Sequence, residues 1–159
     1  MSGSRSSVYL VRHGETAWSV SGQHTGRTDL PLTERGERNA HAVGARLRGL
    51  SFAKVLTSPL RRALRTCELA GFGDIAEIGS DLVEWDYGQY EGRRTPDIQA
   101  ERPGWLLFRD GCLGGEAAGL CFLRDTGSMS ALSCAHNMTE PDLRLWNQSC
   151  TAPAEGNEL

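Results

Sequence analysis

The stretch that decides the fold reads VYLVRHGET and occupies residues 8–16. Its first four residues are apolar or aromatic and favour a buried strand, and this pattern stops abruptly at Arg12 and His13. In an open α/β sheet, ligands bind just beyond the carboxyl ends of the strands. A guanidinium suits a phosphate group, an imidazole can act as a nucleophile, and Gly14 lets the backbone turn sharply beside a ligand. An ordinary loop after a strand is the alternative interpretation of the Arg-His pair.

The residues that follow predict alternating helices and strands. Thr33 is a predicted N-cap of a helix that reaches residue 50, whose apolar positions at helical spacing are Ala40, Val43, Gly44 and Leu47. Residues 52–57 predict a second strand, and Ser58 and Pro59 predict the N-cap and first turn of a second helix. The strand–helix–strand order predicts a right-handed parallel βαβ unit. A short strand at residues 74–78 and two short helical segments, 95–102 and 105–109, complete the predicted elements.

Length and composition place broad limits on the function. A chain of 159 residues suits one domain, and a net charge of −3 gives no general attraction to nucleic acid or to an anionic membrane. No apolar run approaches the ~20 residues of a membrane span, and residues 1–7 are expected to be a disordered lead-in without a signal-peptide core. The five cysteines are odd in number and lack Cys-x-x-Cys spacing. This favours idle thiols in a cytoplasmic protein over disulfides or zinc.

Two polar segments are candidates for binding an anion. Residues 23–29 read QHTGRTD and lie in a predicted loop, 17–32, where polar side chains and backbone N–H groups suit a phosphorylated or hydroxylated substrate. Residues 58–66 read SPLRRALRT and begin a helix, where the dipole and backbone N–H groups attract anions. A solvated loop and an exposed basic helix are the respective alternatives.

A third segment, LVEWDYGQYEG at residues 82–92, places three carboxylates among aromatic rings. Burial beside rings can raise the pKa of a carboxyl group enough to make it a general acid. Surface acids beside packed rings are the alternative interpretation.

Taken together and in this order, these segments resemble the motifs of the histidine phosphatase superfamily, which includes the cofactor-dependent phosphoglycerate mutases. The matching runs are RHGET at 12–16, HTGRTDLPLT at 24–33, SPLRRALRT at 58–66, LVEWDYGQYEG at 82–92 and GGE at 114–116. They are most similar to a bacterial-type branch and to fungal sedoheptulose-bisphosphatase-like enzymes. The resemblance covers residues 8–116 and implies an α/β three-layer sandwich, with a mostly parallel central sheet and helices on both faces.

The resemblance also implies site residues. His13 would be the nucleophile that forms a phosphohistidine, Arg12 and Arg62 would hold the transferred phosphate, and Glu84 would donate a proton to the leaving group. Glu91 is interpreted as structural. No metal or other cofactor is implied, because the arginines neutralise the phosphate charge. Beside the two arginines, the residues expected to bind the substrate are Thr16, Gln23, Thr25 and Gly26.

The implied function is that of a phosphatase acting on small phosphorylated metabolites such as sugar phosphates. Water as the acceptor gives a phosphatase, and a second hydroxyl gives a phosphoglycerate mutase-type phosphotransferase. A third alternative is an inactive phosphate-binding fragment, because relatives carry a second site histidine on a later strand. The expected partner is a small phosphorylated molecule, without nucleic acid or membrane.

The family pattern ends after Glu116. His136 is the only downstream candidate for the second histidine, but it follows too closely for the helix that relatives place before it, and Asn137 replaces the usual glycine. We therefore expect the family fold to be incomplete after residue 116, with residues 117–159 forming an atypical, poorly ordered tail. Residues 8–11 would then lack a neighbouring strand for their backbone groups.

Overall fold

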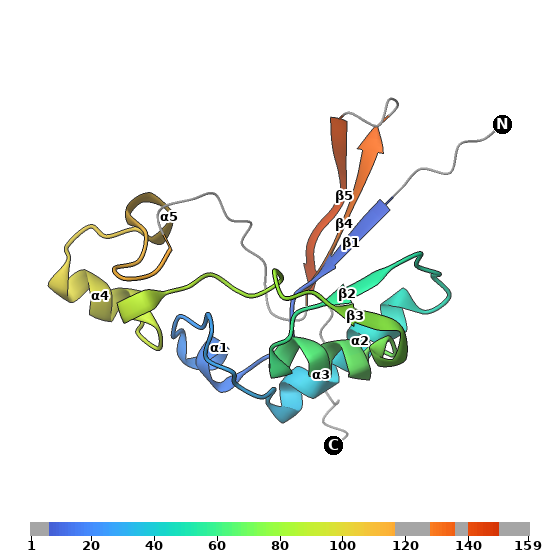
Figure 1. Cartoon of the computed structure of the whole chain (residues 1–159), viewed down its shortest axis with the longest axis horizontal. Coiled ribbons are helices and arrows are strands. Elements are labelled where there is room, and N and C mark those ends of the chain that lie inside the picture. Colours follow the sequence, from blue (N-terminus) through green and yellow to red (C-terminus); the bar gives the residue numbers. More distant parts are fainter. Residues whose placement is uncertain (1–6, 117–127, 136–139, 150–159) are drawn as a thin grey trace, which may run out of the picture.

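The computed structural model describes residues 7–116, together with the backbone of residues 128–135 and 140–149. Figure 1 shows the arrangement of the elements. The first half of the chain contains β1 (Ser7–Val11), α1 (Ala17–Ser21), α2 (Glu34–Leu47), β2 (Val55–Thr57), α3 (Arg61–Leu69) and β3 (Ala76–Ile78). The second half contains α4 (Thr95–Glu101), α5 (Leu107–Asp110), β4 (Ser128–Ala135) and β5 (Glu140–Ser149). Two 3₁₀ turns, η1 (Gly73–Ile75) and η2 (Gly88–Tyr90), precede β3 and α4.

The strands form two sheets of different kinds. β2 and β3 pair in parallel, with Val55 opposite Ala76, so β2, α3 and β3 form a βαβ unit. β1 pairs antiparallel with β4, which pairs with β5. The α/β class is confirmed, but the pairing differs from the expectation: among the described strands, the neighbour of β1 is β4 rather than β2.

The expectation that residues 8–11 lack a neighbouring strand was wrong. All five residues of β1 have partners on β4, from Ser7 opposite Ser133 to Val11 opposite Met129. Buried backbone N–H and C=O groups strongly favour such pairing, and the β4–β5 hairpin supplies it. Ser7, which we expected to belong to the lead-in, is the first residue of β1, and residues 1–6 lie outside the described residues.

One face of β1 packs against α2. The hydroxyl of Thr33 accepts a hydrogen bond from the Gly36 N–H at 3.0 Å, which confirms the predicted N-cap. Val43 and Leu47, on the apolar face of α2, form a cluster with the inward-facing β1 residues, Tyr9 and Val11. Figure 1 shows α2 and α3 close together beneath the strands.

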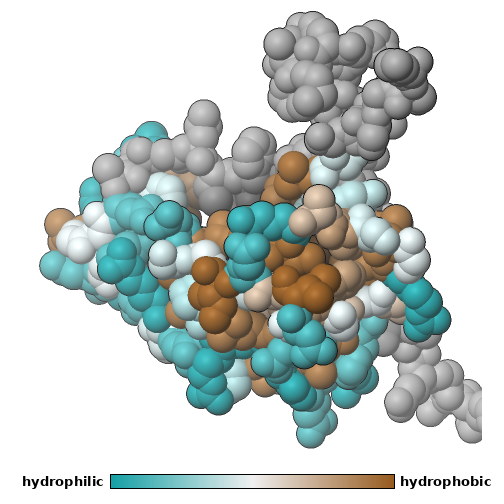
Figure 2. Space-filling model, turned by 45° about the vertical axis from the view of Figure 1, so that its right-hand side comes forward, coloured by the Kyte–Doolittle hydropathy of each residue, from teal (hydrophilic) through white to brown (hydrophobic). Residues whose placement is uncertain are grey.

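The opposite face of the strands is open over part of its area. Val8 is 55% exposed and Leu56 is 51% exposed, so no described helix covers them. Figure 2 shows apolar side chains reaching the surface among charged ones. None of the described helices is long and apolar enough to cross a membrane.

A second core holds the lobe that contains α4 and α5. Its buried members, Tyr90, Ile98, Trp105 and Cys112, come from four separate segments. The rings of Tyr90 and Trp105 meet edge to face with centroids 5.2 Å apart. This core fixes residues 85–92 beside residues 23–28, the loop that carries one of the predicted binding motifs.

Several element boundaries differ from the prediction by a few residues, and two of these differences bear on the site. The predicted loop at residues 17–32 begins with a short helix, α1, which Thr16 and Ser19 cap reciprocally. Helix α3 begins at Arg61 rather than beside Ser58. The carboxylate of Asp29 accepts a hydrogen bond from the Arg61 N–H at 2.7 Å. A residue distant in sequence therefore provides the acceptor for one of the N–H groups that the helix itself leaves unpaired at this terminus.

Gly14 lies against the backbone of α2, and this contact should be sensitive to a single methyl group. A Cβ atom at residue 14 would lie 2.2 Å from the carbonyl oxygen of Gly36. We expect Gly14→Ala to lower the free energy of unfolding by about 2–4 kcal/mol, because two backbone segments would have to separate. Urea unfolding measures this. A variant as stable as the parent would contradict the close approach.

Candidate functional site

His13 lies just beyond the carboxyl end of β1 and is half-buried. Its Nδ1 atom lies 2.7 Å from the carbonyl oxygen of Gly14, so the tautomer that fits this contact donates from Nδ1. The lone pair of Nε2 is then the nucleophilic one. Burial lowers the pKa of His13 to about 4; the Gly14 hydrogen bond opposes this, and the positive charges of Arg62 and Arg12 reinforce it. The imidazole is therefore neutral at neutral pH.

This lowered pKa predicts the pH dependence of activity and of stability. The profile of kcat/KM should have its acid limb near pH 4, the pKa of His13 in the folded protein, rather than near the ordinary 6.5. Between these two values the unfolded chain binds more protons than the folded one, so the free energy of unfolding falls as the pH falls through this window. Urea unfolding at pH 7 and pH 5 should show the loss, and His13→Ala should reduce it. An acid limb near pH 6.5 would contradict the burial of this imidazole.

Arg62 differs sharply from its neighbours on α3. It is 1% exposed, and its guanidinium donates to the carbonyl oxygens of Thr28 at 2.9 Å and Gly26 at 2.8 Å. Arg65, by contrast, is exposed and pairs with Glu37 and Glu68 on the surface. Of these two arginines, Arg62 is thus the one that faces the interior.

The charge of Arg62 is balanced by carboxylates. Burial lowers the pKa of Arg62, and the nearby carboxylates of Glu84, Asp29 and Glu91 oppose that shift. Arg12 repels the same guanidinium, and both arginines act electrostatically on His13. The two guanidinium groups beside a neutral imidazole can bind an anionic ligand through charge-assisted hydrogen bonds.

Of the three carboxylates, Glu84 has the largest effect on the pKa of Arg62. It follows β3 and is half-buried, and its Oε1 atom accepts a hydrogen bond from the Trp85 N–H at 3.0 Å. Charge interactions connect the four residues predicted to be catalytic. Three separate segments supply them: the end of β1 carries Arg12 and His13, α3 carries Arg62, and the segment after β3 carries Glu84.

Thr66 connects two of these segments, a role that the sequence motifs did not predict. The Gly14 N–H donates to the Thr66 hydroxyl at 3.0 Å, and that hydroxyl donates to the Arg62 carbonyl oxygen at 2.7 Å. Thr66 is 4% exposed, so these contacts are shielded from water. They fix the residue after His13 relative to the backbone of Arg62. The only sequence signal was the final threonine of SPLRRALRT.

Beside Gly26, whose N–H donates to Glu91 at 2.9 Å, the other three non-arginine residues predicted to bind substrate have side chains that bond within the protein. The Thr16 hydroxyl accepts from the Ser19 N–H at 3.2 Å and caps α1. The Gln23 side chain donates to the Gly92 carbonyl oxygen at 2.7 Å. The Thr25 hydroxyl donates to the Gln23 carbonyl oxygen at 3.2 Å. These contacts place the three residues in the framework of the loop, and their binding of substrate stays a prediction.

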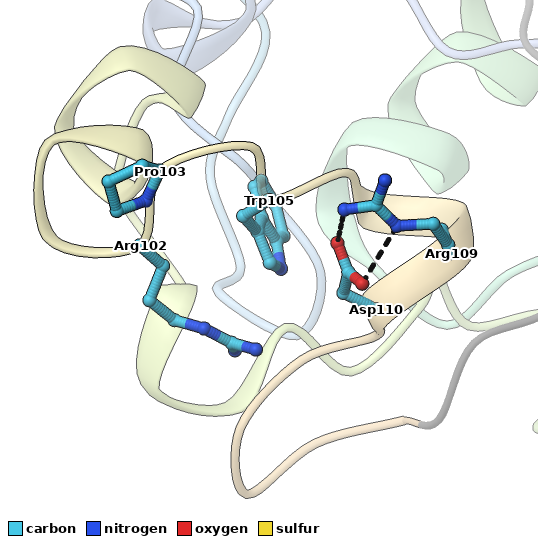
Figure 3. Close-up of a pocket in the computed structure, with 5 residues that line it drawn as sticks. All are labelled: Arg102, Pro103, Trp105, Arg109 and Asp110. Carbon is cyan, nitrogen blue, oxygen red and sulfur yellow. Dashed lines mark hydrogen bonds and ion pairs between the residues drawn. The ribbon is translucent and has the colours of Figure 1, made fainter.

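A small hollow lies in the α4–α5 lobe, away from the predicted site residues. It has a volume of about 140 Å³ and is lined by Arg102, Pro103, Trp105, Arg109 and Asp110. Figure 3 shows that the guanidinium of Arg109 is already paired with the Asp110 carboxylate. Arg102 donates to the Tyr90 hydroxyl at 2.8 Å. None of the residues predicted for the site lines this hollow.

Within the part of the chain that the structure describes, no group of three or more His, Cys, Asp or Glu side chains could hold a metal ion. His136, the candidate for a second site histidine, lies outside the described residues.

Comparison with known proteins identifies the family of this chain. Residues 8–119 match the family described as the histidine phosphatase superfamily (branch 1). The chain belongs to this superfamily. The match includes His13, Arg62 and Glu84, and it ends close to the point where the motif pattern of the sequence stops.

The relatives of this member of the superfamily include named phosphatases. An acid phosphatase of Mycobacterium tuberculosis is 46% identical over 112 residues, covering 69% of this chain and 55% of its own. Sedoheptulose 1,7-bisphosphatase of Saccharomyces cerevisiae is 35% identical over 159 residues, covering 85% of this chain and 58% of its own. Several bacterial relatives that are 40–41% identical are named probable phosphoglycerate mutase GpmB. The chain spans about half the length of the curated relatives it matches.

A solved structure supports the fold. The protein of the open reading frame Rv3214 from Mycobacterium tuberculosis superposes with a TM-score of 0.78 and 28% identity, over 91% of this chain and 98% of that one. The overall fold of this chain is therefore that of a histidine phosphatase.

Proposed function

We propose that this chain hydrolyses small phosphorylated metabolites of the sugar-phosphate class through a phosphohistidine on His13. The observation that carries the proposal is the neutral imidazole, with Nδ1 engaged by Gly14, set beside the positive charges of Arg12 and Arg62. A neutral Nε2 has a lone pair for phosphorus, and the two guanidinium groups offset the charge that develops on the phosphoryl oxygens.

The reaction balances as two displacements. Nε2 of His13 forms a bond to phosphorus while the bond from phosphorus to the sugar oxygen breaks, and the carboxylic acid form of Glu84 gives that oxygen a proton. The Glu84 carboxylate then accepts a proton from water as the water oxygen attacks phosphorus and the N–P bond breaks. Inorganic phosphate leaves, and Glu84 and His13 return to their starting forms.

The names of the relatives favour water as the acceptor and a sugar phosphate as the donor, because an acid phosphatase and a sedoheptulose bisphosphatase are among them. The mutase-type relatives support an alternative, in which the hydroxyl of a phosphorylated acid accepts the phosphoryl group from His13. The same phosphohistidine serves both reactions, so the acceptor alone separates them.

The test is a comparison of products. The chain is incubated with a panel of sugar mono- and bisphosphates and with 3-phosphoglycerate, and inorganic phosphate and positional isomers are measured in the same samples. We expect phosphate release from at least one sugar phosphate, without isomerisation of 3-phosphoglycerate. Isomerisation without phosphate release would favour the mutase, and neither product would indicate an inactive fragment.

A further inference from the structure

We propose that Glu91 is a positioning residue that holds Arg62 in its phosphate-binding orientation through the backbone of residues 26–28. The inference deepens the proposed function, on which it rests for the identity of the ligand as phosphate. Glu91 lies seven residues after Glu84 and is half-buried, and its motif alone indicates a structural residue.

Glu91 and Arg62 hold the same two residues through opposite backbone groups. Oε1 of Glu91 accepts from the N–H of Gly26 at 2.9 Å and of Thr28 at 3.1 Å, and Oε2 lies 3.1 Å from the Gly26 nitrogen. The carbonyl oxygens of Gly26 and Thr28 accept from the Arg62 guanidinium at 2.8 and 2.9 Å. The carboxylate therefore fixes the loop, and the loop fixes the guanidinium.

The loop has little freedom to adjust in another way. A Cβ atom on Gly26 would lie 2.0 Å from the Trp85 carbonyl oxygen, so the backbone there is already in close contact with the segment that carries Glu91. The Gly92 N–H also donates to the His24 carbonyl oxygen at 2.9 Å. These contacts make the segment after β3 a rigid support for the loop.

A carboxylate suits this position better than a neutral side chain does. Two backbone N–H groups converge on it, and a charged acceptor makes stronger hydrogen bonds than an amide oxygen. Its negative charge also acts on Arg62 across the loop, together with the charges of Glu84 and Asp29. A glutamine with its oxygen at the Oε1 position would accept from both N–H groups more weakly than a carboxylate does, and its NH₂ group would face the Gly26 N–H at the Oε2 position.

The first arm of the test does not depend on phosphate. Glu91→Gln is compared with Glu101→Gln, a matched change of a surface carboxylate that pairs with Arg93. Amide hydrogen exchange of the folded protein is measured at residues 23–29. We expect exchange at Gly26 and Thr28 to accelerate by about tenfold or more in the first variant and to stay unchanged in the second. Unchanged exchange in both variants would overturn the proposal.

The second arm is a double-mutant cycle on the Kd of inorganic phosphate, using Glu91→Gln, Arg62→Ala and the double variant. We expect Glu91→Gln to weaken binding by about tenfold in the parent and to have no further effect once Arg62 is alanine. Equal effects in both backgrounds would overturn the proposal, because Glu91 would then act independently of Arg62. If the parent binds phosphate with this coupling but hydrolyses no substrate, the proposed function fails and the positioning role stands.

Discussion

Replacing His13 by alanine should reduce phosphate release from the best sugar phosphate by at least about 10³-fold, because the proposed reaction has no other group to accept the phosphoryl unit. Binding of inorganic phosphate should weaken much less, since Arg12 and Arg62 remain. Initial rates at saturating substrate, together with a phosphate titration, measure the two effects separately. The expected signature is therefore a loss in kcat with a small change in affinity.

The matched control for this change is His41→Ala. His41 is exposed on α2, so its replacement should leave both rate and affinity unchanged. A His13→Ala variant as active as the His41→Ala variant would remove His13 from the mechanism. The comparison also excludes a general effect of losing one imidazole.

Replacing Arg62 by alanine should damage both activity and stability. The side chain is 1% exposed, and its loss would leave the carbonyl oxygens of Gly26 and Thr28 without their donor and would open a cavity beside them. We expect the free energy of unfolding to fall by about 2–4 kcal/mol. We expect kcat/KM, measured well below the melting temperature, to fall by about 10²–10³-fold.

Arg65→Ala provides the matched control on the same helix. Arg65 is exposed and makes surface ion pairs, which contribute little to stability, so the free energy of unfolding and kcat/KM should change little. Arg62→Lys keeps the positive charge but lacks the planar fork that bonds both carbonyl oxygens. If Arg62→Lys matched the parent in kcat/KM, the argument from guanidinium geometry would be wrong.

The local parts of this molecule could be predicted from the sequence. Thr33 marks the start of α2 because its own hydroxyl caps the helix, a signal contained within four residues. The strand that stops before Arg12 was also visible, because a change from apolar to polar residues needs no distant partner. The ordered motifs then indicated the family, and the match over residues 8–119 confirmed it.

The parts that depend on distant partners could not be predicted. The Arg61 N–H at the start of α3 donates to Asp29, which lies 32 residues away in the sequence. The start of this helix therefore could not be predicted from the neighbouring residues alone. The pairing of β1 with β4 depends on a segment whose pattern departs from the family. The Thr66 and Glu91 contacts join backbone groups that lie 52 and 63–65 residues away, and periodicity carries no information at such separations.

The most direct measurement is the trapping of the phosphorylated protein. The chain is mixed with a ³²P-labelled sugar phosphate, quenched within the first turnover in alkali, and digested for peptide mapping. The account predicts a label that is stable in alkali and labile in acid, on the peptide that contains His13. A chain that releases phosphate at the same rate without forming this label, or that carries it on His24 or His41, would contradict the account.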